Sequence, residues 1–262
     1  MFTTTERETF ARQGLIKREN FLPAQKVEAA RKVIFHQLAQ AGLWRNGGWT
    51  LDKARPTTEL TAGMALVKPL DHHPAIMALA SEEAPTAASA LVDGRPLFPM
   101  SRHPGLLFTL PNATTWTVPH QNWHLDLPRL ADGGVPGVQI FAFLETVEPG
   151  GGGTLVVTGS QRLGNTGMRI SSGDLRKQLK QEPYFAELMS HQAGDRLHFL
   201  HEVGHVGDVA LQVVEMTGKA GDAYFMDLRV FHTIAPNMRS IPRIMLTQRY
   251  LLEAARITLY GQ

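Results

Sequence analysis

One histidine of the chain is followed two residues later by a carboxylate, in the segment Trp123-His124-Leu125-Asp126-Leu127. On an extended chain, residues two apart project from the same face, so the side chains of His124 and Asp126 can bind one cation together. Two imidazoles and one carboxylate, with the remaining coordination positions open, suit iron(II) in oxygen chemistry. The second imidazole must then come from elsewhere in the chain.

The segment GDAYFMDLRVFHTIAPNMRSIPRIMLTQRY, residues 221–250, can supply that imidazole. Gly221 and Asp222 make a turn, an apolar strand follows, and His232 stands at the end of this strand. Arg243 comes eleven residues later, on the next predicted strand. We therefore propose His232 as the third metal ligand.

A second segment could supply the first metal ligands instead. Residues 120–122, His-Gln-Asn, resemble the His-x-Asp pattern and lie four residues before it, with an amide in place of the carboxylate. An amide cannot supply the negative charge that iron(II) favours, so the pair that begins with His124 is preferred. If strand alternation holds, Trp116, His120 and Asn122 share the face of His124 and line its pocket. Purely structural roles for these three side chains are the alternative.

The composition of the 262 residues is that of a globular chain, with 43% hydrophobic and 19% charged residues, and predicts one domain over residues 1–262. Lys and Arg are scattered and the formal charge is only +2, so we expect a small-molecule partner and no nucleic acid. The absence of cysteine excludes thiolate metal sites. A polar N-terminus and the lack of a long apolar run predict a cytoplasmic protein without membrane contact.

The first part of the chain, residues 1–105, has helical patterns. Apolar residues recur at spacings of three and four over residues 23–41, which predicts an amphipathic helix. A second helix is expected over residues 74–91, broken or kinked at Pro85.

The character changes at about residue 106. Short apolar or alternating runs punctuated by Gly and Pro extend to about residue 252, which is typical of strands and turns. A polar stretch over about 164–208, with a helix after Asp174, is interpreted as an insertion between strands. Helices first and strands afterwards predict an α+β domain whose sheet part is a sandwich or barrel. No feature of the sequence specifies an oligomeric state.

The spacing of these motifs resembles the phytanoyl-CoA dioxygenase family of iron(II)- and 2-oxoglutarate-dependent oxygenases, which carry His-x-Asp, a late His and an Arg about eleven residues beyond it. The segment GVQIFAFLETVEPGGGGTLVVTGSQRLG is similar to the family's strand, acidic turn, glycine-rich hairpin and Pro-Gly-Ser-His segment. The entry ARQGLIKRENFLPAQKVEAARKVI is similar to its opening strand and helix. Thr158 and Gln161 stand where the family usually has Pro and His, and Gly151-Gly152 replaces Glu-Asn, but none of these is a metal ligand.

The resemblance implies a double-stranded β-helix, a cupin-like jelly roll, with flanking N-terminal helices and a helical insertion between strands. Iron(II) is the implied cofactor, with 2-oxoglutarate and O2 as cosubstrates. Arg243 is implied to bind the C5 carboxylate of 2-oxoglutarate in a two-point geometry that Lys cannot reproduce. The implied outcome is hydroxylation of a small molecule with release of succinate and CO2. Arg249 shares the parity of Arg243 and either meets an anionic substrate or pairs with an internal carboxylate.

Two other functions compete with this interpretation. His201, Glu202 and His205 satisfy the His-Glu-x-x-His pattern of zinc metallopeptidases, which requires a helix. Val203 and Gly204 are weak helix formers, so a polar loop between strands is favoured. A jelly-roll binding or isomerising protein that uses no 2-oxoglutarate is the other alternative. Arg243, eleven residues after His232, argues against it because such a protein needs no residue to bind a cosubstrate.

Overall fold

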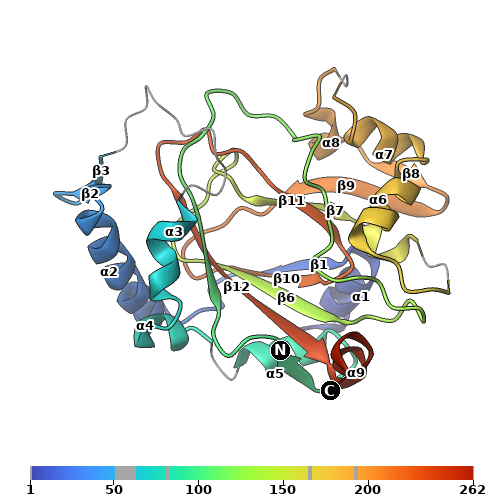
Figure 1. Ribbon diagram of the computed structural model, residues 1–262, viewed down its shortest axis with the longest axis horizontal. Helices are drawn as coiled ribbons and strands as arrows, with labels where there is room; N and C mark the ends of the chain where they lie inside the picture. Colours follow the sequence, from blue (N-terminus) through green and yellow to red (C-terminus); the bar gives the residue numbers. More distant parts are fainter. Residues whose placement is uncertain (1, 51–62, 81–82, 165–166, 192–193, 262) are drawn as a thin grey trace.

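Two antiparallel sheets lie face to face in the centre of the computed structural model (Figure 1), which describes residues 2–50, 63–80, 83–164, 167–191 and 194–261. The larger sheet has the order β1-β10-β6-β12-β4, with β5 also paired to β12, and the smaller has the order β11-β7-β9-β8. Strands from distant parts of the sequence alternate in both sheets. This arrangement confirms the predicted jelly roll with flanking helices.

The elements have the following bounds. The larger sheet consists of β1 (Leu15–Arg18), β4 (Leu97–Pro99), β5 (Gly105–Thr109), β6 (Gly137–Phe143), β10 (Ala223–Asp227) and β12 (Arg243–Leu252). The smaller sheet consists of β7 (Thr154–Thr158), β8 (Gly204–Val206), β9 (Val209–Glu215) and β11 (Phe231–Ile234). The strands β2 (Trp44–Arg45) and β3 (Gly48–Trp49) form a separate hairpin. The helices are α1 (Thr4–Gln13), α2 (Ala24–Gln40), α3 (Met64–Val67), α4 (Pro74–Met77), α5 (Glu83–Ala90), α6 (Ser172–Leu179), α7 (Pro183–Leu188), α8 (His198–His201) and α9 (Glu253–Tyr260), with 3-10 turns η1 (Lys68–Leu70) and η2 (Ser160–Arg162).

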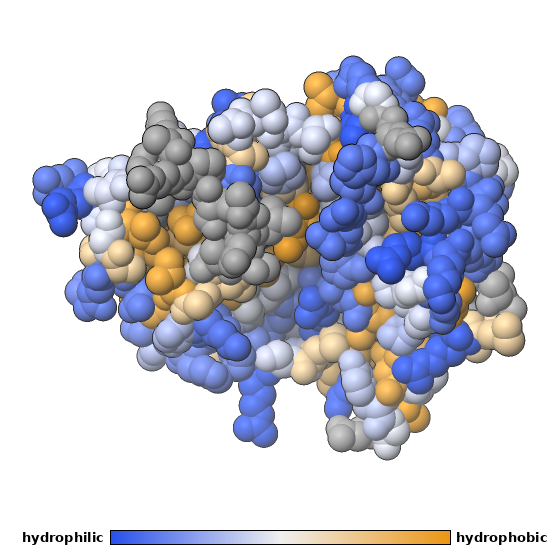
Figure 2. Space-filling view, turned by 45° about the horizontal axis from the view of Figure 1, so that its top comes forward, coloured by the Kyte–Doolittle hydropathy of each residue, from blue (hydrophilic) through white to orange (hydrophobic). Residues whose placement is uncertain are grey.

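The helices α6, α7 and α8 are inserted between β7 and β8 and cover the outer face of the smaller sheet (Figure 1). Phe185 of α7 and Phe199 of α8 belong to one buried cluster with Leu155 and Val157 of β7. The surface on this side of the molecule is mostly hydrophilic (Figure 2). No helix among the described residues is both long and apolar enough to cross a membrane.

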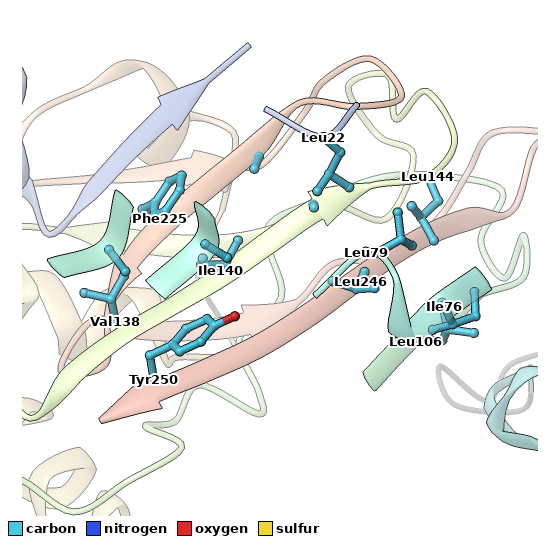
Figure 3. Close-up of a cluster of buried hydrophobic side chains, with 14 of the residues drawn as sticks. Leu22, Ile76, Leu79, Leu106, Val138, Ile140, Leu144, Phe225, Leu246 and Tyr250 are labelled. Atoms are coloured by element: carbon cyan, nitrogen blue, oxygen red, sulfur yellow. The ribbon is translucent and has the colours of Figure 1, made fainter. Parts of the chain in front are cut away.

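The outer face of the larger sheet is covered by the N-terminal helices. The predicted helix over 23–41 is confirmed as α2, which buries the apolar side of its surface through Val27, Ala30, Ile34 and Leu38. Each such side chain contributes about 1.5–3 kcal/mol when it is fully buried. Figure 3 shows the core that they join, in which Val138 and Ile140 of β6 lie beside residues of β10 and β12.

Alternation along β12 decides which of its side chains face the space between the sheets. Ile244 and Leu246 belong to the helical core outside the larger sheet. Met245, one residue out of phase with them, packs in a different cluster together with Val156 of β7 in the opposite sheet. Residues of the same parity as Met245, including Arg243, therefore point between the two sheets.

The helix predicted over 74–91 is wrong in one respect, because the structure has two shorter helices, α4 and α5, in its place. Pro85 does not break α5 but lies in its first turn, at its third residue. A proline is tolerated there because the backbone N–H that it lacks would have no partner within the helix.

The carboxyl group of Glu215, at the end of β9, ties down the glycine-rich hairpin by accepting hydrogen bonds from the backbone N–H of Gly150 at 3.1 and 2.9 Å. Burial raises the pKa of Glu215 to about 7, although these hydrogen bonds act in the opposite direction. The folded state thus binds a proton that the unfolded chain has already released above pH 5, so the contribution of this carboxyl to stability decreases between about pH 4.5 and 7.

We expect the free energy of unfolding of wild type to fall, relative to that of Glu215→Gln, by on the order of 1–3 kcal/mol between pH 5 and pH 8. The glutamine carries no ionisable proton, so the comparison isolates this one group. Urea unfolding of both proteins at the two pH values measures the difference. A constant difference would show that Glu215 titrates normally.

Candidate metal centre

A backbone bridge joins the two segments that carry the proposed histidine ligands. The N–H of His124 donates to the carbonyl of His232 at 2.9 Å, and the N–H of His232 donates back at 3.0 Å. His232 in turn is paired with Val156 of β7. The two rings therefore lie together, with their centroids 4.4 Å apart.

Asp126 completes a cluster of three donors. Its Oδ1 lies 3.5 Å from Nε2 of His124, and its Oδ2 lies 3.7 Å from Nε2 of His232. One donor atom from each residue falls within 4.8 Å of the other two, and within the described ranges no other group of His, Asp and Glu meets this criterion. One cation can contact all three side chains, so the residues fit a metal ion. Their role as its ligands stays a prediction.

Backbone carbonyls orient both imidazoles toward this cluster. Nδ1 of His124 lies 2.7 Å from the carbonyl oxygen of Asn122, and Nδ1 of His232 lies 3.0 Å from that of Val230. A carbonyl can only accept, so each Nδ1 carries a hydrogen and each Nε2 is the nitrogen that faces the cluster. Such outer partners fix the tautomer of metal-binding histidines. Sequence patterns cannot reveal them because backbone acceptors leave no trace in residue type.

The charges around Asp126 keep it ionised. Burial alone would raise the pKa of Asp126, but its contacts with the imidazoles of His124 and His232 and the charge and hydrogen bonds of Arg249 lower it far below its usual range. Arg249 donates from Nε and Nη2 to Oδ2 at 2.8 and 2.6 Å. Burial lowers the pKa of His232 to about 4. At neutral pH the cluster thus offers a carboxylate and a neutral imidazole, which are the forms that bind metals.

Arg249 therefore pairs with an internal carboxylate, that of Asp126, which is one of the two roles expected for it from the sequence. Its side chain spans from β12 to Asp126, which lies 123 positions earlier. The predicted contact of Arg249 with substrate stays a prediction.

Arg243, at the start of β12, is 3% exposed, and its Nε and Nη1 have no hydrogen-bond partner. No ion pair joins it to an acidic side chain of the described residues. Burial lowers the pKa of Arg243 to about 10, which still leaves it cationic at neutral pH. A buried charge without a counterion is costly. The carboxylate of a bound molecule would supply the missing partner.

The side chains predicted to share the face of His124 do not lie on a strand with it, and their place in a substrate pocket stays a prediction. Residues 111–123 are not in a strand, so the alternation on which that prediction depended does not apply. Trp116 packs near Gly150 of the glycine-rich hairpin. His120 and Asn122 line a pocket on the side of the insertion helices instead.

Gln139 is an interior polar residue that the sequence interpretation missed. It lies on β6, is 1% exposed, and donates from Nε2 to Thr247 Oγ1 of β12 at 3.0 Å. Its Oε1 has no partner. The sequence could have indicated it, because Gln139 is the one polar side chain in the otherwise apolar run GVQIFAF.

The His-Glu-x-x-His pattern does not form a zinc site in this fold. The helix α8 ends at His201, and Glu202 has an extended backbone with φ −103° and ψ 138°. His205 lies on β8, so the two histidines do not share one helical face. This supports the interpretation of the motif as a turn between elements.

The front of the chain holds another histidine-rich segment, Asp71-His72-His73, which has structural contacts. Oδ1 of Asp71 accepts from the N–H of Leu106 at 3.1 Å, and Nδ1 of His73 accepts from the N–H of Ala75 at 3.2 Å. These bonds cap α4 and fasten β5.

Comparisons with known proteins agree with this geometry. The family model "Phytanoyl-CoA dioxygenase (PhyH)" matches residues 10–245. Among solved structures, AviO1 from Streptomyces viridochromogenes Tue57 is similar at 20% identity and a TM-score of 0.55, over 97% of this chain and 98% of that chain. SnoK, a non-heme alpha-ketoglutarate-dependent carbocyclase from nogalamycin biosynthesis, is similar at 17% identity and a TM-score of 0.55, over 95% of this chain and 84% of that one.

No curated protein matches the sequence. At these identities the two solved structures establish the fold, whereas the family model covers most of the chain. The match confirms the predicted dependence on iron, 2-oxoglutarate and O2, for which the His-Asp-His cluster provides a fitting donor set. The chain belongs to the phytanoyl-CoA dioxygenase family and is an oxygenase-type enzyme that depends on iron and 2-oxoglutarate.

Proposed function

We propose that the enzyme hydroxylates a small-molecule substrate, with His124, Asp126 and His232 as iron ligands and Arg243 as the partner of the C5 carboxylate of 2-oxoglutarate. One observation carries the proposal: Arg243 is a buried cation without an acidic partner among the described residues, and it faces the same space between the sheets as the three donors. Iron(II) bound there supplies the coupling of O2 activation to the decarboxylation of 2-oxoglutarate to succinate and CO2.

The residues of the chain have three other roles in this proposal: they bind the metal, bind 2-oxoglutarate and exclude water. Two imidazoles and one carboxylate would hold the iron and would leave coordination positions open for the cosubstrates. Arg243 binds the C5 carboxylate, at the end of 2-oxoglutarate away from the metal, and burial strengthens the attraction between the two charges. The apolar side chains of Phe141, Met245 and Val156 pack between the sheets and exclude water from this space.

Arg249 is proposed as a positioning residue. Because both of its hydrogen bonds go to Oδ2 of Asp126, the other oxygen, Oδ1, remains free on the side of His124. The carboxylate is thereby held in one rotation and offers a single oxygen to the metal.

Arg249→Gln should weaken iron affinity about 10–100-fold, since loss of an outer-shell partner of a metal ligand has that typical effect. At saturating iron, 2-oxoglutarate affinity should stay close to that of wild type, because Arg243 is untouched. Anaerobic titrations of each ligand measure the two quantities separately. Wild-type iron affinity in the variant would refute the positioning role. A selective loss of 2-oxoglutarate affinity would assign Arg249 to the cosubstrate.

The proposed function itself is tested by metal analysis combined with substrate-independent conversion of 2-oxoglutarate to succinate. We expect about one iron per chain and slow succinate formation that stops when a chelator removes the metal. Tightly held zinc with peptide cleavage would instead favour the peptidase alternative. Iron without any turnover of 2-oxoglutarate would favour a jelly-roll binding protein.

A further inference from the structure

A pocket of about 700 Å³ lies between the segment that precedes His124 and the insertion helices. The segment before His124 lines it with His120, Asn122 and Trp123, and the insertion lines it with Arg176, Lys180 and His191. None of the lining residues is acidic. The pocket thus combines two permanent cations with two imidazoles.

One cation, Arg176, lies on α6, and the other, Lys180, is the residue that directly follows this helix. Arg176 and Lys180 are four residues apart, so their side chains are neighbours on the helix surface. Neither has an acidic partner in the described part of the chain, whereas Lys177, on another face, pairs with Asp174 at 3.3 Å. Two like charges placed together without a counterion repel each other. An anion bound between them would remove this repulsion.

The two imidazoles line the same pocket as these cations. The rings of His120 and His191 meet edge to face, with their centroids 4.8 Å apart. Nε2 of His120 is buried and has no hydrogen-bond partner. Burial lowers the pKa of His120, and the charges of His191 and Arg196 act in the same direction. A buried polar atom without a partner is costly, so the His120 ring, which lines the pocket, would gain a partner by turning this nitrogen toward a bound anion.

The pocket is lined by the residues that directly precede His124 in the chain. Asn122, which lines it, has a left-handed backbone with φ 63°, and its carbonyl accepts the hydrogen bond from Nδ1 of His124. Trp123 is the neighbour of His124 and donates from Nε1 to the carbonyl of Pro119 at 2.8 Å. A group held in this pocket is therefore anchored beside a proposed iron ligand.

We propose that this pocket binds a phosphate or sulfate group carried by the substrate, so that the substrate of the oxygenase is an anionic ester of this kind. The assignment to the substrate rests on the proposed function, while the anion site does not. A dianion matches two fixed cations and two imidazole N–H groups. The volume exceeds that of an inorganic anion, which leaves room for the organic part of the molecule.

The anion site is tested by calorimetric titration of inorganic phosphate and inorganic sulfate into the full-length, metal-free protein. We expect saturable binding that weakens at least tenfold in the double variant Arg176→Glu/Lys180→Glu, because the attraction becomes repulsion. Lys177→Glu is the matched control, since it changes the same charge on the same helix outside the pocket, and should bind like wild type. Equal affinities in all three proteins, or no saturable binding by wild type, would overturn the proposal.

A second variant protects the test against misfolding. His120→Phe keeps an aromatic ring against His191 but removes the unpartnered nitrogen, and should weaken phosphate binding severalfold without changing the folded circular-dichroism spectrum. An unchanged affinity would remove His120 from the site.

The source of the anion is decided with the iron-loaded enzyme. Saturating phosphate should leave substrate-independent succinate formation unchanged if the pocket only anchors a substrate. A phosphate-dependent change in this rate, absent in the double variant, would make the ligand a separate effector and refute the assignment to the substrate. If the enzyme forms no succinate at all, the proposed function fails, but the calorimetric result still decides whether the anion site exists.

Discussion

Asp126→Ala should abolish succinate formation and reduce bound iron to less than a tenth of a molar equivalent. The substitution removes the one carboxylate from a cluster whose other two members are imidazoles, and iron(II) favours an anionic oxygen ligand. The fold should survive, because the partner of Asp126, Arg249, has a side chain that is 35% exposed and can turn to water. Metal analysis, turnover and thermal unfolding of the same preparation measure the three effects.

Asp126→Asn refines this test, since it keeps the shape and the acceptor oxygen but loses the charge. We expect iron affinity between those of wild type and Asp126→Ala. Glu202→Gln is the control for the rival motif and should leave iron content and turnover unchanged. Normal coupled turnover in a folded Asp126→Ala protein would remove this residue from the metal site.

Arg243→Ala should lower the affinity for 2-oxoglutarate by roughly two to three orders of magnitude while iron binding stays intact. Removing one partner of a buried ion pair costs on the order of 3–5 kcal/mol, and each factor of ten in affinity corresponds to about 1.4 kcal/mol. Before the ligand arrives, the guanidinium of Arg243 has no counterion among the described residues. Its removal should therefore destabilise the free protein much less than it weakens binding.

Arg243→Lys should have an intermediate affinity, because an ammonium keeps the charge but loses the paired, planar hydrogen bonds. Anaerobic titration of 2-oxoglutarate into the iron(II) form of each variant gives the values. If Arg243→Ala bound 2-oxoglutarate as tightly as wild type and Arg249→Gln did not, the roles proposed for the two arginines would have to be exchanged.

The sequence was sufficient for those features that depend on local spacing. His124 and Asp126 are two residues apart, and their proximity follows from an extended backbone alone. The helix α2 follows from its apolar repeat, and the jelly roll from the order of helices and short strands together with the family resemblance. Parity on β12 correctly places Arg243 and Arg249 on one face, because a long strand paired on both sides keeps its alternation.

Other features depend on contacts between distant segments and could not be predicted. The residues before His124 are not in a strand, and the guanidinium of Arg196, far along the chain, donates to the carbonyls of Val118 and Pro119. The partner of Arg249 is likewise set by tertiary structure. Arg196 lies in the insertion, where the sequence shows only polar character, so nothing local indicated that it would shape the approach to the metal centre.

The backbone bridge between His124 and His232 also bears on which metal the protein carries. Folding has already met the entropy cost of bringing these two segments together, so an ion can enter or leave without refolding of the chain. A preformed site of two imidazoles and one carboxylate binds zinc and copper more tightly than iron(II), according to the general order of divalent affinities. Correct loading with iron is therefore decided by the supply of free ions around the protein rather than by the selectivity of its donors.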